Sequence, residues 1–138
     1  MRKSYKVSLS ILLLVIGGIL YIIYRDKSLI MFSWFEMVGL DNLIDNIREY
    51  VKIHPYCWIK YNLPAGLWLF SYMFMMDAIW NDCKSVNKEM FIWILPAIAL
   101  LSELMQIFGL CPGTFDIFDL LSYLLAIILF KTIKYYEK

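Results

Sequence analysis

The chain has 138 residues, and 62% of them are hydrophobic, which exceeds the roughly half found in ordinary soluble domains. Its mean hydropathy is +0.65, and apolar runs long enough to cross a bilayer indicate an integral membrane protein. The formal net charge of +1 gives no bulk attraction to nucleic acid, and the three cysteines show no metal-site spacing. We therefore expect one membrane domain over residues 1–138, in contact with the lipid bilayer and without nucleic acid, metal or cofactor.

The first apolar run covers residues 8–24 and follows three basic residues within positions 2–6. A secretory signal peptide has the same layout. However, no A-x-A-like cleavage site follows the run, and Tyr24 with Arg25 is typical of a stop at the membrane interface. We expect a retained first transmembrane helix, with a signal peptide as the alternative.

Residues 41–53 predict an amphipathic helix, because apolar side chains recur there at helical spacing. Its polar face is mixed and slightly acidic, which favours a helix packed on the bundle or lying in the membrane interface over a sensor of anionic lipid. Residues 29–40 before it are apolar but too short to span a bilayer, so they predict an interfacial or re-entrant piece. The apolar stripe consists of Leu40, Leu43, Ile44, Ile47, Tyr50 and Val51.

Three more apolar runs follow, at about residues 63–80, 90–108 and 115–131. Pro64 suits the first turn of a helix, and Asn62 before it is a residue type that often caps one. The chain therefore predicts an all-α fold, a four-transmembrane-helix bundle with an amphipathic interfacial helix.

Eight basic residues lie at the two chain ends and in the segment after the second run, whereas the turn after the third run has none. The long loop after the first run has five, but they are spread over its length and matched by acidic residues. By the positive-inside rule, both termini are then cytoplasmic and that turn faces outward. Cys57 and Cys111 would both lie outside, where a disulfide between them can form.

The segment 103–119 places acidic residues deep in apolar sequence on both sides of a tight turn. Charged groups inside membrane helices are costly and often mark function. At 1.5 Å per residue, Glu103 and Asp119 both lie roughly 6–8 Å below the outer boundary, on neighbouring antiparallel helices. Two carboxylates there would not both ionise cheaply, so they could share a proton, hold a cation or act as general acid and base. We expect Glu103 to be protonated or to share a proton at neutral pH.

A purely structural explanation covers the two aspartates. Asp116 can cap the following helix, and Asp119 then lies in its first turn, where the helix dipole favours negative charge. Glu103 has no such local reason, so it indicates a function or an interhelical bond to Gln106, Ser122 or Tyr123. No catalytic residue can be assigned. The candidate cluster is Glu103, Gln106, Asp116 and Asp119, with Asn62, Asp77 and Tyr123 as secondary candidates.

Asp77 lies near the inner boundary of the second span. The favoured interpretation is a structural ion pair, with Lys84, Lys131 or Lys134 as the partner.

The hairpin resembles the VanZ-like family over about residues 103–126. That family combines an E-x-x-Q pair, a short turn with glycine and arginine, a Phe-Asp pair and then D-x-x-x-N. Glu103 and Gln106 match the first pair, and Phe115-Asp116 and Asp119 match the later acids. Two positions differ: Gly113 stands where the family has arginine and Tyr123 where it has asparagine. The resemblance implies a small multi-pass protein of a bacterial inner membrane, in a family linked to glycopeptide resistance.

Three functions remain open. The first is a non-enzymatic, accessory role in envelope physiology or resistance at the outer face, with the acids hydrogen-bonded and sealed. The second is an enzyme acting on a lipid-linked or envelope ligand through Glu103, Asp116 and Asp119, which needs a polar pocket open to the outer leaflet. The third is a proton- or cation-coupled transporter subunit, which needs a polar path from Glu103 to Asp77. So short a transporter would form a homo-oligomer.

Overall fold

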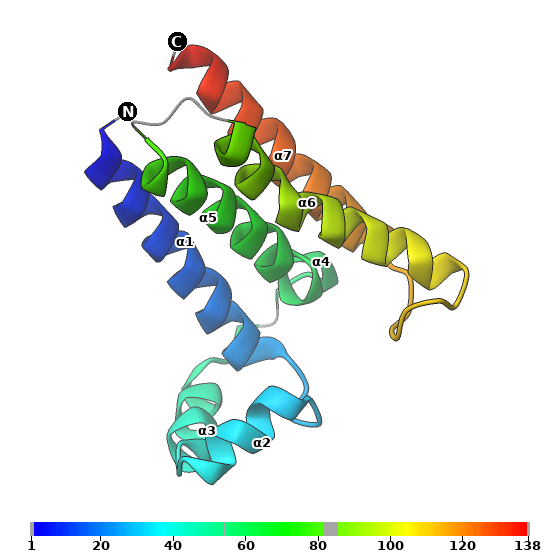
Figure 1. Ribbon diagram of the computed structural model, residues 1–138. Coiled ribbons are helices and arrows are strands. Elements are labelled where there is room, and N and C mark those ends of the chain that lie inside the picture. The colour runs from blue at the N-terminus through cyan, green and yellow to red at the C-terminus, as the bar shows by residue number, and fades with distance from the viewer. Residues whose placement is uncertain (1, 54, 82–85, 138) are drawn as a thin grey trace.

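The computed structural model describes residues 2–53, 55–81 and 86–137 (Figure 1). The described part consists of helices joined by loops and contains no strand, so the predicted all-α class is confirmed. The helices are α1 (Lys3–Tyr24), α2 (Ile30–Met37), α3 (Asp41–Tyr50), α4 (Cys57–Tyr61), α5 (Leu63–Ile79), α6 (Val86–Ile107) and α7 (Ile117–Tyr136).

Helix α5 is the centre of the bundle and packs against α1, α6 and α7 (Figure 1). Both chain termini lie at one end of the four long helices, which we call the terminal end. The α6–α7 turn and α4 lie at the opposite end, which we call the hairpin end. Helices α2 and α3 form a small pair beyond the last turn of α1 (Figure 1).

The buried core is small and lies between α5, α6 and α7. Its fully packed members are Met73, Phe74, Ile92 and Phe130. Nearer the hairpin end, α5 and α7 approach each other closely at Gly66, where an added Cβ would lie 3.0 Å from the backbone oxygen of Ser122. Small residues at such crossings let helix backbones come together, as is typical of membrane bundles.

The outer surface of the bundle is strongly apolar. Leu12, Ile98, Leu101 and Ile128 are each more than half exposed, whereas soluble monomers rarely expose large contiguous apolar patches. Among the described helices, α1 and α6 are long and apolar enough to cross a membrane. Helix α5 has only 17 residues, and α7 carries charged residues near both ends. These features indicate membrane association, and two of the four predicted spans meet the length and composition test.

Helix α3 is amphipathic, but most of its apolar stripe does not face the protein. Ile44 is buried, whereas Leu43 and Ile47 are 55% and 41% exposed. The bundle is contacted instead by Arg48 on the polar face, which donates to the backbone oxygens of Ile22 (2.8 Å from Nε) and Arg25 (2.7 Å from Nη2). These carbonyls at the end of α1 have no partner within their own helix. Of the two sequence alternatives, the exposed stripe favours the interfacial one.

Candidate functional site

Asn62 joins two acidic residues at the hairpin end. Its side-chain amide donates to Asp116 Oδ2 at 2.9 Å and to Asp119 Oδ1 at 3.0 Å, and the residue is 3% exposed. We predicted an N-cap at Asn62, but its side chain makes no capping bond to α5. Asp116 does cap α7, because its Oδ1 accepts from the backbone N–H of Phe118 at 2.8 Å. The three residues therefore connect the start of α5 to the start of α7.

Glu103 is buried and held by groups from the same turn. With the Gln106 amide oriented so that its nitrogen donates, that nitrogen lies 3.2 Å from Glu103 Oε2 and 3.1 Å from the Thr114 carbonyl oxygen. The backbone N–H of Asp116 also donates to the Glu103 carboxylate. Glu103 is within electrostatic range of Asp116 and Asp119, although neither aspartate side chain bonds to it directly. The hairpin thus gathers the four principal candidates, and most of their polar atoms are engaged internally.

The other two partners considered for Glu103 are placed differently. The Ser122 hydroxyl is buried and has no hydrogen-bond partner in the described part of the chain. Tyr123 lies within electrostatic range of both Glu103 and Asp119. The bond to Gln106 is therefore the one that the structure provides.

Gly113 is required by the geometry of the turn. Its φ of +122° belongs to the region that side chains rarely adopt, and an added Cβ would lie 2.8 Å from the end of the Gln106 side-chain amide. An arginine at this position would be strained and would displace the amide that binds Glu103. The turn of this chain therefore cannot carry the arginine of the VanZ-like pattern in this conformation.

The positive charge near this cluster comes from Arg25, which directly follows α1. A cavity of about 330 Å³, which we call the Arg25 groove, opens at the hairpin end. Its polar lining is Arg25, Asp119, Tyr123, Tyr21 and Tyr61. Its apolar lining is Pro64, Ala65, Trp68, Leu69, Leu95 and Ala99. The five helices α1, α4, α5, α6 and α7 thus meet around one space, with one acidic and one basic side chain in its wall.

Two tyrosines position the Arg25 guanidinium. Its carbon lies 5.4 Å from the ring centre of Tyr21 and 5.5 Å from that of Tyr61, which are cation–π distances. Arg25 Nε is buried without a hydrogen-bond partner among the described residues, and no ion pair joins Arg25 to Asp119 there. Sequence reasoning interpreted Arg25 only as an interfacial stop. The one available signal was its position directly after an apolar helix rich in tyrosine.

Asp77 belongs to a separate cluster at the terminal end. It is fully buried and bonded to lysines from three helices: Lys6 at 2.5 Å, Lys134 at 2.7 Å and Lys88 at 2.9 Å. Lys6 also contacts Glu137 at 2.8 Å. We call these five residues the lysine hub. An ionised carboxylate surrounded by three ammonium groups is a structural clamp between α1, α5, α6 and α7.

The hub differs in part from the predicted ion pair. Lys134 is a partner of Asp77, as expected. Lys131 instead lies over the ring of Trp93, 5.1 Å from its centre, and Lys84 is outside the described residues. Lys6 and Lys88 were not foreseen, because Lys6 lies 71 positions from Asp77 and because both looked like ordinary loop charges.

An apolar layer separates the lysine hub from the Arg25 groove. Met73 lies one turn from Asp77 along α5, Ile92 one turn from Lys88, and Phe130 one turn from Lys134, each toward the hairpin end. This apolar layer lies between α5, α6 and α7, whereas the buried polar residues Ser10 and Ser71 lie between α1 and α5, where the Ser71 hydroxyl donates to the Ser10 carbonyl.

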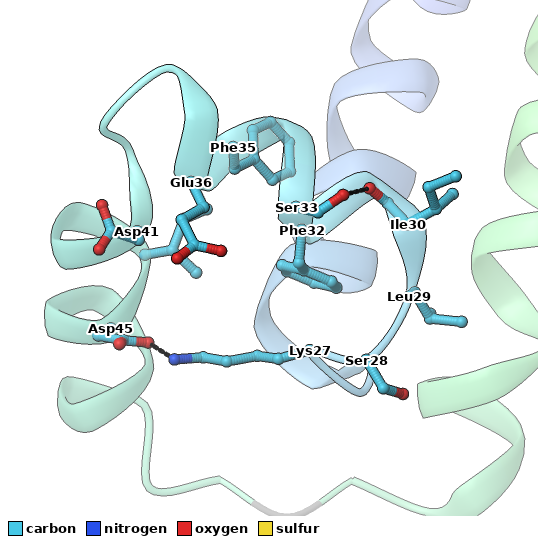
Figure 2. Close-up of a pocket in the computed structure, with 11 residues that line it drawn as sticks. Lys27, Ser28, Leu29, Ile30, Phe32, Ser33, Phe35, Glu36, Asp41 and Asp45 are labelled. Carbon is cyan, nitrogen blue, oxygen red and sulfur yellow. Dashed lines mark hydrogen bonds and ion pairs between the residues drawn. The ribbon is translucent and has the colours of Figure 1, made fainter.

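A larger cavity, of about 560 Å³, lies between α2 and α3 (Figure 2). Of its four charged side chains, Lys27 and Asp45 form an ion pair, and both are about half exposed; the other two are Glu36 and Asp41. Exposed pairs of this kind contribute little, and the cavity holds no buried unpaired group. It is a weaker candidate site than the Arg25 groove despite its size.

Metal and disulfide chemistry have no support in the described residues. No group of three or more His, Cys, Asp or Glu side chains there could hold a metal ion. Cys57 and Cys111 are both free thiols, so the disulfide considered from the sequence is not formed.

Comparison of the chain with protein-family models, with curated proteins and with solved structures returns no match.

Proposed function

We propose that the chain is a multi-pass protein of a bacterial inner membrane, with α1, α5, α6 and α7 as four spans and both termini cytoplasmic. Its role is accessory and non-enzymatic, in envelope physiology or antibiotic resistance at the outer face. The strongly exposed apolar surface and the lysines at the terminal end support the membrane arrangement. The bacterial setting and the link to resistance rest on the VanZ-like pattern of the hairpin.

The observation that carries this proposal is the Arg25 groove at the end of the bundle assigned to the outer face. Glu103 and Asp116 are tied to Gln106, Asn62 and backbone amides, as an accessory role requires. Glu103 and Asp116 stabilise the turn and so hold Asp119 in the wall of the groove. The groove is then a binding site whose walls are fixed by the acidic hairpin.

An enzyme acting on a lipid-linked substrate is the second candidate. Asp119 and Tyr123 both line an open groove, and an aspartate there can act as a general acid or base. Glu103 does not line the groove, which leaves the enzyme with one carboxylate instead of the expected three. A transporter subunit has less support, because a polar path from Glu103 to Asp77 would have to avoid the apolar layer between α5, α6 and α7.

The test expresses the chain in bacteria that lack it and measures the inhibitory concentration of a glycopeptide and of other envelope-active antibiotics. The full chain should raise tolerance, and Arg25→Gln and Asp119→Asn should abolish the gain. Lys27→Gln and Asp45→Asn, which remove matching charges from exposed positions outside the groove, should keep it. Groove variants that protect as well as the parent chain would exclude the groove as the working site. An enzyme would in addition change the mass of a lipid-linked precursor extracted from these cells.

A further inference from the structure

Two opposite charges face the Arg25 groove without pairing. Arg25 has a buried Nε that bonds to nothing in the described part of the chain. Asp119 uses Oδ1 to accept from Asn62, and Arg25 is within its electrostatic range but forms no ion pair with it. Both residues are partly buried, and charges withdrawn from water in this way are costly unless they are paired. A ligand that carries both an anionic and a cationic group would satisfy both side chains at once.

The rest of the groove is apolar and runs deeper into the bundle. Ala99 and Leu95 lie one and two turns below Glu103 along α6, and Trp68 and Leu69 line the facing part of α5. The two charged groups are therefore at the mouth, and the largely apolar wall is below them. This arrangement suits an amphiphile that enters from the membrane with its polar head at the hairpin end.

We propose that the Arg25 groove binds an aminophospholipid, a membrane lipid whose headgroup holds both a phosphate and a primary ammonium. The phosphate pairs with Arg25, the ammonium pairs with Asp119, and one acyl chain lies along the wall formed by Trp68 and Leu95. This inference rests on the proposed function, which assigns the groove as the working site, and names the class of its ligand.

Charge complementarity selects this class over the alternatives. An anionic lipid without an amine would satisfy Arg25 but would bring a phosphate close to Asp119, with Asp116 and Glu103 behind it. A simple cation would satisfy Asp119 and leave Arg25 unpaired. A quaternary ammonium lacks the N–H donors that a carboxylate accepts, so a choline headgroup should bind more weakly than an ethanolamine headgroup.

The experiment measures lipid binding to the full chain in detergent by native mass spectrometry. Short-chain phosphatidylethanolamine, phosphatidylglycerol and phosphatidylcholine are added in turn. The parent chain should prefer ethanolamine over glycerol by about tenfold, which corresponds to about 1.4 kcal/mol. Arg25→Gln should weaken binding of all three lipids. Asp119→Asn should remove the preference for ethanolamine while it keeps the binding of phosphatidylglycerol.

Lys27→Gln and Asp45→Asn are the matched controls and should bind like the parent. Size-exclusion profiles and helical circular dichroism should be the same for all variants, which separates loss of ligand from loss of fold. Equal binding of all three lipids, or a preference that survives Asp119→Asn, overturns the inference. If the groove variants lose antibiotic tolerance in cells but keep the lipid preference, the ligand class is wrong and the proposed function stands. If the lipid preference changes with the variants as described but the groove variants keep full antibiotic tolerance, the ligand class stands and the proposed function is wrong.

Discussion

Glu103 keeps its place in an apolar helix because two donors face it, the Gln106 amide and the Asp116 backbone N–H. We predict that Glu103→Leu lowers the free energy of unfolding by roughly 1–3 kcal/mol, since it removes the acceptor that both donors use. Glu103→Gln retains a carbonyl oxygen as acceptor and should unfold close to the parent. Denaturant unfolding in detergent, followed by circular dichroism, gives both values. Equal stability of the leucine and glutamine variants would mean that these contacts contribute nothing.

Glu137 makes stability depend on pH at the terminal end. Burial disfavours its charged form, but nearby positive charges together outweigh burial, with the hydrogen bond and the charge of Lys6 the largest among them, so the pKa of Glu137 lies below its ordinary value of 4.5. A carboxylate with a depressed folded pKa stabilises the protein above its unfolded pKa, and this stability is lost as pH falls through the folded pKa. Glu137→Gln should therefore be less stable at neutral pH and show a flatter loss below about pH 4.5.

The check is the thermal midpoint measured in detergent at a series of pH values from neutral to acidic. Asp45→Asn, which removes an exposed carboxylate at the other end of the molecule, serves as control and should follow the parent curve. Parallel curves for Glu137→Gln and the parent would show that the Lys6 contact does not contribute to folding.

Local chemistry explains which site residues were predictable. The cap of α7 at Asp116 and the shared helix face of Glu103 and Gln106 were both predictable. Each of these contacts joins residues that are only two or three positions apart in the sequence. The bridge from Asn62 joins positions 54 and 57 residues apart, and no periodicity encodes such a contact. Arg25 was missed for the same reason, because Tyr61, which contacts it, and Asp119, which faces the same groove, come from distant helices.

At the scale of elements, the crossing of α5 and α7 depends on a missing side chain. Gly66→Leu should disrupt the bundle, because its Cβ would meet the backbone oxygen of Ser122, which cannot rotate away. Overpacking of this kind typically costs about 1–3 kcal/mol. Gly18→Leu is the matched control in α1, since a Cβ at Gly18 meets nothing within 4 Å. Thermal unfolding of the two variants gives the comparison, and equal midpoints would argue against close packing at Gly66.

Apolar periodicity predicted the long helices because each buries or exposes hydrocarbon along its whole length. The end of α3 was harder to predict from the sequence, since the helix ends at Tyr50 and not at residue 53. The surroundings of α3 were harder still to predict. The pattern of Leu43 and Ile47 says that one face is apolar, but it does not say whether protein or lipid covers that face.

At the scale of the whole molecule, the proposed topology places the hairpin end outside the cell. Single cysteines at the native position Cys111 and at Asn42→Cys should react with an impermeant thiol reagent added to intact cells. A single cysteine at Asn87→Cys should react only after the membrane is permeabilised. The other native cysteines are replaced by serine in each case. Labelling of Asn87→Cys alone in intact cells would invert the orientation and move the Arg25 groove to the cytoplasmic face.

The lysine hub has a consequence for biosynthesis. It draws on Lys6 in the first helix and on Lys134 and Glu137 at the end of the last, so its contacts span up to 131 positions. In the proposed topology, α1, α5 and α6 enter the membrane before these last partners leave the ribosome. Until then, Asp77 lacks one of its three ammonium partners, and Lys6 lacks one of its two carboxylates. The cluster is therefore completed only when the end of α7 arrives, and chains that stop before α7 carry an incompletely neutralised cluster.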